Sequence, residues 1–185
     1  MVKIAINGFG RIGRLFFRQT FGHPELEIVA INDLGDLENL SYLLQYDTVY
    51  HTYERKVAVN QEQHKLIIDG KEIAIIQEKD PTKLPWKDLN VDIVIESTGV
   101  FESFEKSKAH LDAGSKRVVI TAPAKDAESE IGRTVLLGIN EEDFKKYKIF
   151  SAGSCTTNAA APAMAIMAES LGIQKAILNT THAYT

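Results

Sequence analysis

The feature that most constrains the fold is a glycine-rich loop between a short apolar run and an amphipathic segment. Residues 2–7 are apolar and β-branched, which predicts a buried strand, and they lead directly into Gly-Phe-Gly-Arg-Ile-Gly at 8–13. A second apolar run, 26–32, ends in Asp33, which lies 20 residues after Gly13. This order of features indicates a dinucleotide-binding βαβ unit: a strand, the spacing G-x-G-x-x-G, a helix, a second strand and an acid.

Each glycine of this loop has a physical task. Gly8 allows the tight turn, Gly10 lets backbone N–H groups approach a pyrophosphate, and Gly13 lets the helix pack closely on the strand. Asp33 would accept hydrogen bonds from the adenosine ribose, and its charge would repel a 2′-phosphate. The expected cofactor is therefore NAD rather than NADP.

The remaining pattern predicts an α/β fold with a doubly wound, mostly parallel (Rossmann) sheet. An Asp-Gly pair at 69–70 joins two β runs within 65–76, which predicts an antiparallel hairpin inserted into that sheet. Helices are expected at 36–45, 103–113 and 159–171, with a short helix capped by Asn140. Further strands are expected at 91–96, 116–121, 134–138, 149–151 and 174–181.

The only cysteine, Cys155, lies where an extended run turns into an Ala-rich helical run. A thiol in the first turn of a helix faces free backbone N–H groups and the positive end of the helix dipole, and both favour the thiolate. The alternative is a small buried hydrophobic side chain. His182, 27 residues later, could pair with Cys155 in space, although spacing alone leaves this open.

Composition excludes several other classes of function. A net charge of −4 disfavours nucleic acid or a membrane surface as the main partner. A single cysteine forms no internal disulfide, and no apolar run approaches the roughly 18 residues of a membrane span. We see no signal peptide and no metal-ligand spacing among the histidines, so we expect a cytoplasmic protein without a metal site.

Taken together, several motifs resemble the phosphorylating glyceraldehyde-3-phosphate dehydrogenases along the whole chain. The matching segments are 6–14 (INGFGRIGR), 32–33 (ND), 44–47 (LQYD), 96–101 (ESTGVF), 122–124 (APA), 154–158 (SCTTN) and 182–185 (HAYT). The chain departs from the family pattern in having Ala-Gly before Ser154 and Ala159 in place of a common second cysteine. Residues 125–133 are also longer and more acidic than that pattern.

This resemblance implies a catalytic pair, Cys155 as nucleophile and His182 as its base. It implies that Ser154 and Thr156 donate to inorganic phosphate, and that Thr185 donates to a phosphate on the substrate or cofactor side. The NAD-binding residues that it implies are Asn7, Gly8, Gly10, Arg11, Ile12, Gly13, Asp33, Lys79, Thr98, Gly99, Phe101 and Thr121.

The implied substrates are glyceraldehyde 3-phosphate and inorganic phosphate, and the implied assembly is a homotetramer. Family members are longer, so residues 1–154 are expected to form the NAD-binding domain and 155–185 the first helix and strand of an α+β catalytic domain. By itself the chain is then expected to be inactive or nearly so. Two alternatives remain, an erythrose-4-phosphate dehydrogenase and a non-catalytic NAD-binding module.

Overall fold

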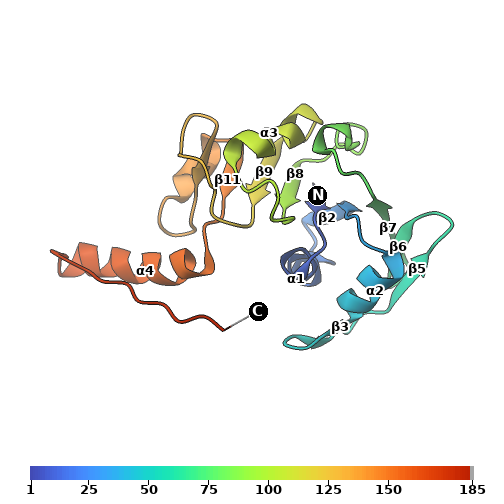
Figure 1. Cartoon of the computed structure of the whole chain (residues 1–185), viewed down its shortest axis with the longest axis horizontal. Coiled ribbons are helices and arrows are strands. Elements are labelled where there is room, and N and C mark those ends of the chain that lie inside the picture. Colours follow the sequence, from blue (N-terminus) through green and yellow to red (C-terminus); the bar gives the residue numbers. More distant parts are fainter. Residues whose placement is uncertain (184–185) are drawn as a thin grey trace.

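The computed structural model describes residues 1–183, and within them nine strands form one sheet in the order β10-β11-β9-β8-β1-β2-β7-β6-β5 (Figure 1). The helical elements are α1 (Arg11–Thr20), α2 (Leu37–Gln45), α3 (Phe104–Asp112), α4 (Cys155–Ser170) and the 3-10 turns η1 (Pro81–Lys83) and η2 (Glu141–Lys145). The strands are β1 (Val2–Asn7), β2 (Leu26–Asn32), β3 (Tyr46–Asp47), β4 (His51–Thr52), β5 (Val57–Asn60), β6 (Lys65–Ile68), β7 (Lys71–Ile76), β8 (Ile93–Glu96), β9 (Arg117–Ile120), β10 (Gly132–Thr134) and β11 (Ile149–Ser151).

The central strands are parallel, as the sequence predicts. β1 pairs with β2 on one side and with β8 on the other, and β8, β9, β11 and β10 continue in parallel. The carboxyl ends of β1, β2, β8, β9 and β11 therefore meet at one edge of the sheet. From β1 the chain adds β2 and then β7 on one side, and it later returns to add β8 on the other side of β1. The strand order therefore reverses between β1 and β8.

Helices cover both faces of this sheet, so the doubly wound prediction is confirmed. Along β1, Ile4 and Ile6 face one core, which also contains Phe17 of α1 and three leucines of α2. Ala5 between them faces a second core, with Phe104 of α3 and Trp86. Figure 1 shows α3 on one side of the sheet and α1 and α2 on the other. Because successive side chains of a strand point to opposite faces of the sheet, each central strand contributes to both apolar cores.

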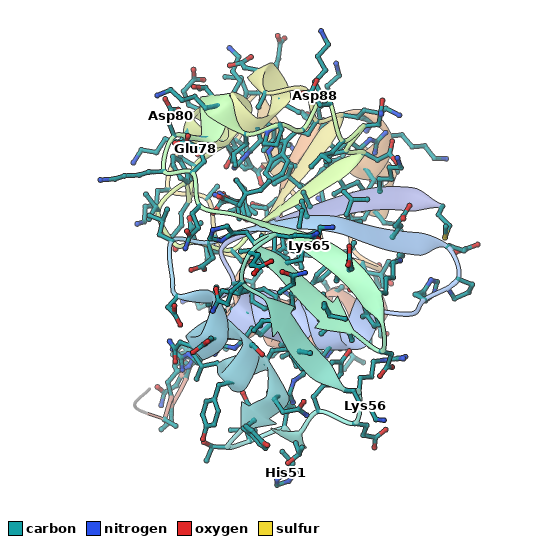
Figure 2. All side chains as sticks on the ribbon, turned by 90° about the vertical axis from the view of Figure 1, so that its right-hand side faces the viewer. His51, Lys56, Lys65, Glu78, Asp80 and Asp88 are labelled. Atoms are coloured by element: carbon teal, nitrogen blue, oxygen red, sulfur yellow. The ribbon has the colours of Figure 1, made fainter. Side chains whose placement is uncertain are left out.

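The predicted hairpin insert is present at the outer edge of the sheet. Asp69 and Gly70 have φ angles of 49° and 84°, the left-handed pair that a two-residue turn between twisted strands requires. β7 is parallel to β2 but antiparallel to β6, so it joins the insert to the parallel sheet. Figure 2 faces this edge, where Lys65 of β6 forms an ion pair of 2.5 Å with Glu72.

The strand expected at 134–138 is misplaced, because β10 covers Gly132–Thr134 instead. The side chain of Asn140 explains the difference. Its Oδ1 accepts a hydrogen bond from the Leu136 N–H at 2.9 Å, and its Nδ2 donates to the Thr134 carbonyl at 2.9 Å. These bonds hold residues 134–140 in a turn, so Asn140 closes a loop and does not cap η2 with its side chain.

The acidic segment that precedes β10 also has a structural role. Asp126 accepts hydrogen bonds from the backbone N–H groups of Phe104 and Glu105, at 2.9 and 3.0 Å. These are two of the free N–H groups at the start of α3, where a carboxylate is favourable. The segment thus caps a helix that lies far from it in the sequence.

The last part of the chain differs most from expectation. α4 begins at Cys155 rather than at Ala159 and runs through Pro162 to Ser170, with none of its side chains buried. It projects away from the sheet, and the following segment runs back along it (Figure 1). The strand expected at 174–181 does not form: no strand pairs with these residues in the described part of the chain, and Ile177 is 97 % exposed.

Candidate functional site

The glycine loop between β1 and α1 has the geometry that its spacing predicts. Gly8 has φ +93°, and a Cβ there would lie 2.6 Å from the Thr98 nitrogen. A Cβ on Gly13 would lie 2.1 Å from the Gly8 carbonyl oxygen, so this glycine allows the helix to approach the strand. A Cβ on Gly10 would meet nothing within 4 Å, which leaves open the approach to the first N–H groups of α1.

Beside this loop lies a cavity of about 410 Å³, a size typical of sites for small molecules and cofactors. It lies at the carboxyl ends of β1, β2 and β8, where ligands bind in open α/β sheets. Its walls include Asn7, Gly8, Gly10, Asn32, Asp33, Leu34, Glu78, Lys79, Pro81, Ser97, Thr98, Val100 and Phe101.

Seven of the predicted cofactor residues therefore line one cavity: Asn7, Gly8, Gly10, Asp33, Lys79, Thr98 and Phe101. The other five lie around it. Arg11 and Ile12 are exposed in the first turn of α1, Gly13 is buried beneath the loop, and Gly99 has φ +74° in the turn after Thr98. Thr121 follows β9 and donates through Oγ1 to the Glu96 carbonyl at 3.1 Å.

Asp33 is held in place by the loops on either side of it. Its Oδ2 accepts a hydrogen bond of 2.6 Å from the Phe9 N–H, and its Oδ1 accepts one of 2.8 Å from the Gly35 N–H. A carboxylate has about four acceptor positions, so two remain for the hydroxyls of a ligand. The carboxylate thus presents a fixed negative charge at the wall of the cavity.

Arg14 supports the glycine loop from behind. Its guanidinium donates to the Phe9 carbonyl at 2.8 Å, and burial lowers the pKa of Arg14 from its ordinary value. A guanidinium stays charged under these conditions. Arg14 is therefore a structural part of the loop and not only a solvated charge on the helix.

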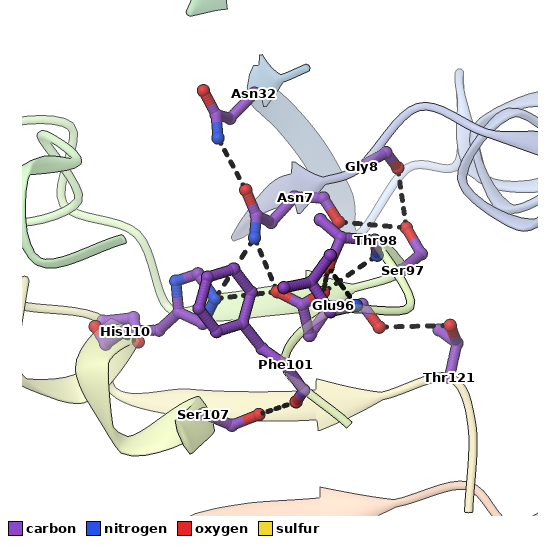
Figure 3. Close-up of polar contacts among 12 residues, drawn as sticks. Asn7, Gly8, Asn32, Glu96, Ser97, Thr98, Phe101, Ser107, His110 and Thr121 are labelled. Carbon is purple, nitrogen blue, oxygen red and sulfur yellow. Dashed lines mark hydrogen bonds and ion pairs between the residues drawn. The ribbon is translucent and has the colours of Figure 1, made fainter. Parts of the chain in front are cut away.

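A network of polar groups (Figure 3) adjoins the cavity through Asn7, Asn32 and Thr98, which line it. Glu96, at the end of β8, and His110, in α3, are 2 % and 0 % exposed and bond to each other at 2.9 Å. The spacing of the histidines indicated no role for His110, and Glu96 appeared only as the first residue of the family motif 96–101. A usable signal was present: β1, β2 and β8 all end in a polar residue, respectively Asn7, Asn32 and Glu96.

Cys155 occupies the first position of α4 and is exposed, so it is not a buried hydrophobic side chain. Ser154 caps the helix by accepting a hydrogen bond of 2.9 Å from the Thr157 N–H. Asn158 donates to the Ala152 carbonyl at 2.7 Å, which fixes the turn before the cysteine. The thiol therefore stands at the helix N-terminus, at the same edge of the sheet as the cavity.

His182 lies next to the cysteine turn, but it contacts Thr156. Its Nε2 is 3.3 Å from the Thr156 hydroxyl, and no hydrogen bond joins the ring to the Cys155 thiol within residues 1–183. The pairing of Cys155 with His182 therefore stays a prediction. Thr185, predicted to bind a phosphate, lies outside the described residues.

The described residues offer neither a metal site nor a membrane-spanning helix. Across residues 1–183, no cluster of three or more His, Cys, Asp or Glu side chains could hold a metal ion. None of the described helices has both the length and the apolar character needed to cross a bilayer.

Comparison with known proteins gives consistent matches. Residues 2–104 match the family described as "Glyceraldehyde 3-phosphate dehydrogenase, NAD binding domain". All of the chain aligns with glyceraldehyde-3-phosphate dehydrogenase of Thermotoga maritima, at 50 % identity over 55 % of that protein. It also aligns in full with the Geobacillus stearothermophilus enzyme of the same name, at 43 % over 54 %, and with glyceraldehyde-3-phosphate dehydrogenase 2 of Bacillus subtilis, at 40 % over 53 %. The chain spans about half the length of the curated relatives it matches.

Proposed function

This chain belongs to the glyceraldehyde-3-phosphate dehydrogenase family, and we propose that it carries an NAD site and a cysteine nucleophile. The proposed activity is that of a phosphorylating, NAD-dependent aldehyde dehydrogenase. The observation that carries the proposal is one edge of a parallel sheet that holds both a cavity beside a glycine loop and an exposed cysteine at a helix N-terminus. The substrates proposed are glyceraldehyde 3-phosphate and inorganic phosphate.

In this proposal the cavity residues bind the cofactor. The free N–H groups at the start of α1 receive the pyrophosphate, since a helix N-terminus favours an anion there. Asp33 accepts hydrogen bonds from the adenosine ribose hydroxyls. When bound, NAD supplies the acceptor for the hydride.

Cys155 carries the covalent chemistry. Its thiolate sulfur forms a bond to the carbonyl carbon of the aldehyde, and the carbonyl π electrons move to oxygen, giving a thiohemiacetal. The backbone N–H of Cys155 and the ring of His182 are proposed to stabilise that oxygen, to which a protonated His182 gives a proton. His182 takes this proton back as the carbon loses a hydride, for which bound NAD would be the acceptor, and the adduct becomes a thioester. Inorganic phosphate, bound by Ser154 and Thr156, displaces the thiolate and leaves as the acyl phosphate. A thiol suits this task because a thioester retains oxidation energy that hydrolysis would lose.

The experiment is a comparison of the full chain with its Cys155→Ser variant. NAD binding is measured by calorimetry, and NADH formation is followed with glyceraldehyde 3-phosphate, phosphate and NAD. We expect NAD binding in both proteins. NADH formation that persists in Cys155→Ser would contradict the role of the cysteine. Turnover of erythrose 4-phosphate in preference to glyceraldehyde 3-phosphate would favour an erythrose-4-phosphate dehydrogenase.

A second candidate is a non-catalytic NAD-binding module. It is favoured by the contact of His182 with Thr156 rather than with Cys155. NAD binding by the full chain without any NADH formation would support it. NAD binding without NADH formation leaves the reactivity of the cysteine untested, so iodoacetamide labelling separates the two candidates. A Cys155 that reacts faster than a free thiol at pH 7 supports a nucleophile.

Two further parts of the proposal concern assembly and location. We propose a homotetramer, as expected from the family, and sedimentation of the protein tests it. We also propose a cytoplasmic site of action, because a working Cys155 has to stay reduced. Localisation of a tagged protein tests this.

A further inference from the structure

We propose that Glu96 and His110 are positioning residues that hold the walls of the cavity in place, although neither of them lines it. The inference rests on the proposed function, because NAD is taken as the ligand. The Glu96 carboxylate lies at the centre of a hydrogen-bond network, with Thr98 on one oxygen and Asn7 and His110 on the other (Figure 3).

The Glu96 carboxylate is buried and uses both of its oxygens. Oε1 accepts from the Thr98 N–H at 2.8 Å and from the Thr98 hydroxyl at 2.5 Å. Oε2 accepts from Asn7 Nδ2 at 2.5 Å and lies 2.9 Å from His110 Nε2. The two oxygens thus contact four groups, and three of these, the Thr98 N–H, the Thr98 hydroxyl and Asn7 Nδ2, donate to the carboxylate. The two bonds to Thr98 fix the turn after β8.

The indole of Trp86 decides the proton position on His110. Trp86 Nε1 lies 3.1 Å from His110 Nδ1, and both residues are fully buried. An indole N–H can only donate, so Nδ1 must accept and carries no proton. The remaining ring proton is on Nε2 and is donated to Glu96 at 2.9 Å, so the longer contact of 3.4 Å between Nε2 and Asn7 Nδ2 joins two donors and is not a hydrogen bond. The structure thus assigns a neutral His110 in the Nε2–H tautomer, whose ring also packs edge-on against Phe101 at 6.1 Å between centroids.

In the other direction the network reaches the opposite wall of the cavity. Asn7 Oδ1 accepts a hydrogen bond of 2.7 Å from Asn32 Nδ2. Asn32 in turn bonds to both backbone groups of Glu78, each at 2.9 Å. Asn7, Asn32, Glu78 and Thr98 all line the cavity. One chain of hydrogen bonds therefore runs from α3 across the ends of β8, β1 and β2 to the segment after β7.

Replacing the carboxylate by an amide tests this arrangement directly. In Glu96→Gln the amide nitrogen must face either the Asn7 and His110 donors or the Thr98 N–H, so at least one buried donor loses its acceptor whichever way the amide turns. We expect NAD binding to weaken by about tenfold, measured by calorimetry with NAD as the titrant. The matched control is Ser115→Ala, which removes a buried hydrogen bond to the His110 carbonyl and leaves the ring and its partners unchanged. It should keep NAD affinity within about twofold of the unsubstituted chain.

The tautomer of His110 is the part of this network that can be measured without a variant. Nitrogen-15 NMR of the unsubstituted chain should show a pyridine-like Nδ1 and a pyrrole-like Nε2 for His110. This measurement needs no variant, so it decides even if Glu96→Gln fails to fold. An Nδ1–H tautomer or a doubly protonated ring would overturn the inference.

A double variant adds a rescue. Trp86→Phe removes the donor that holds His110 in its tautomer, so in the Glu96→Gln background the ring can turn Nε2 into an acceptor for the new amide. We expect a switch to the Nδ1–H tautomer and a smaller loss of NAD affinity from Glu96→Gln than in the presence of Trp86. Equal losses in both backgrounds would overturn the inference.

The outcomes separate the two proposals. Failure of the unsubstituted chain to bind NAD would overturn the proposed function, and the positioning role with it. Normal NAD binding by a folded Glu96→Gln variant would overturn the positioning role alone.

Discussion

Gly13 is the residue at which α1 and β1 approach most closely. In Gly13→Ala the new Cβ would lie 2.1 Å from the Gly8 carbonyl oxygen, which is backbone and can move only with the loop. We expect a loss of about 2 kcal/mol in the free energy of unfolding, as for other forced overpacking, together with weaker NAD binding. Urea denaturation and NAD titration measure the two effects.

The control for that substitution is Gly10→Ala, because its Cβ would meet nothing within 4 Å. Gly10 is also the N-cap of α1, where alanine is less favourable than glycine, so a small loss of stability of a few tenths of a kcal/mol is expected. A Gly13→Ala variant as stable as Gly10→Ala would contradict the close-packing role of Gly13.

Asp33 should set the preference between the two dinucleotide cofactors. Its carboxylate lies in the cavity wall, where it would repel the 2′-phosphate of NADP. We expect Asp33→Asn to reduce the preference for NAD over NADP by about tenfold, measured as the ratio of the two dissociation constants. Asp36→Asn removes a charge nearby and keeps an amide cap for α2, so it should leave the ratio unchanged. An unchanged ratio in Asp33→Asn would rule out the charge as the cause.

The positions of the glycines and of Asp33 beside the cavity could be predicted from the sequence because they depend on neighbours within one βαβ unit. The network around Glu96 could not. Asn7 and Glu96 are 89 positions apart, and Trp86 and His110 are 24 apart, so only the sheet order brings them together. The contact of His182 with Thr156 was missed for a similar reason, since spacing alone does not fix the path of residues 171–183.

The amino ends of the central strands are joined by Asp92, just before β8. Its carboxylate accepts from the Lys116 ammonium at 2.6 Å and from the Lys3 N–H at 2.8 Å, and these bonds, the ammonium first, hold the pKa of Asp92 below its usual 3.8. The pKa of Asp92 is thus lower in the folded chain than in the unfolded chain. Its ionised carboxylate therefore stabilises the fold fully above the unfolded pKa of about 3.9, and this stabilisation is lost as the pH falls through the pKa of the folded chain.

We therefore expect Asp92→Asn to be less stable than the unsubstituted chain near neutral pH, and the difference to shrink as the pH falls below about 3.8. Chemical denaturation at a series of pH values measures it. Asp88→Asn removes the same charge from an exposed neighbouring position and should show no such convergence. If the difference in stability between Asp92→Asn and the unsubstituted chain grew as the pH fell, the lowered pKa of Asp92 would be contradicted.

Most elements were predictable where polar residues mark the end of an apolar run or of a helix. β2 matches its predicted bounds because its apolar run is bounded by polar residues, and α2 begins after the predicted cap, Asp36. β10 was misplaced because the Asn140 side chain closes a loop that β-propensity alone does not reveal. The strand at 174–181 failed because a β-branched run becomes a strand only when a neighbour pairs with it.

The molecule as a whole has parts of very different packing. α3 has nine residues and buries Phe104, Ser107 and His110, whereas α4 has sixteen residues and buries none. Because protection from hydrogen exchange follows burial, we expect amides in β1 and β8 to exchange slowest, α3 slower than α4, and residues 173–183 fastest. Exchange followed by mass spectrometry tests this order. Equal protection of α4 and α3 would contradict it.

The position of β1 in the sheet has a consequence for synthesis on the ribosome. β1 is made first but lies in the middle, with β2 on one side and β8 on the other. About 60 residues separate the end of β2 from the start of β8, which at 5–20 residues per second leaves one edge of β1 open for roughly 3–12 s. An open strand edge invites pairing with other chains. Nascent chains stalled before β8 should therefore aggregate on release, and chains stalled beyond β9 should not.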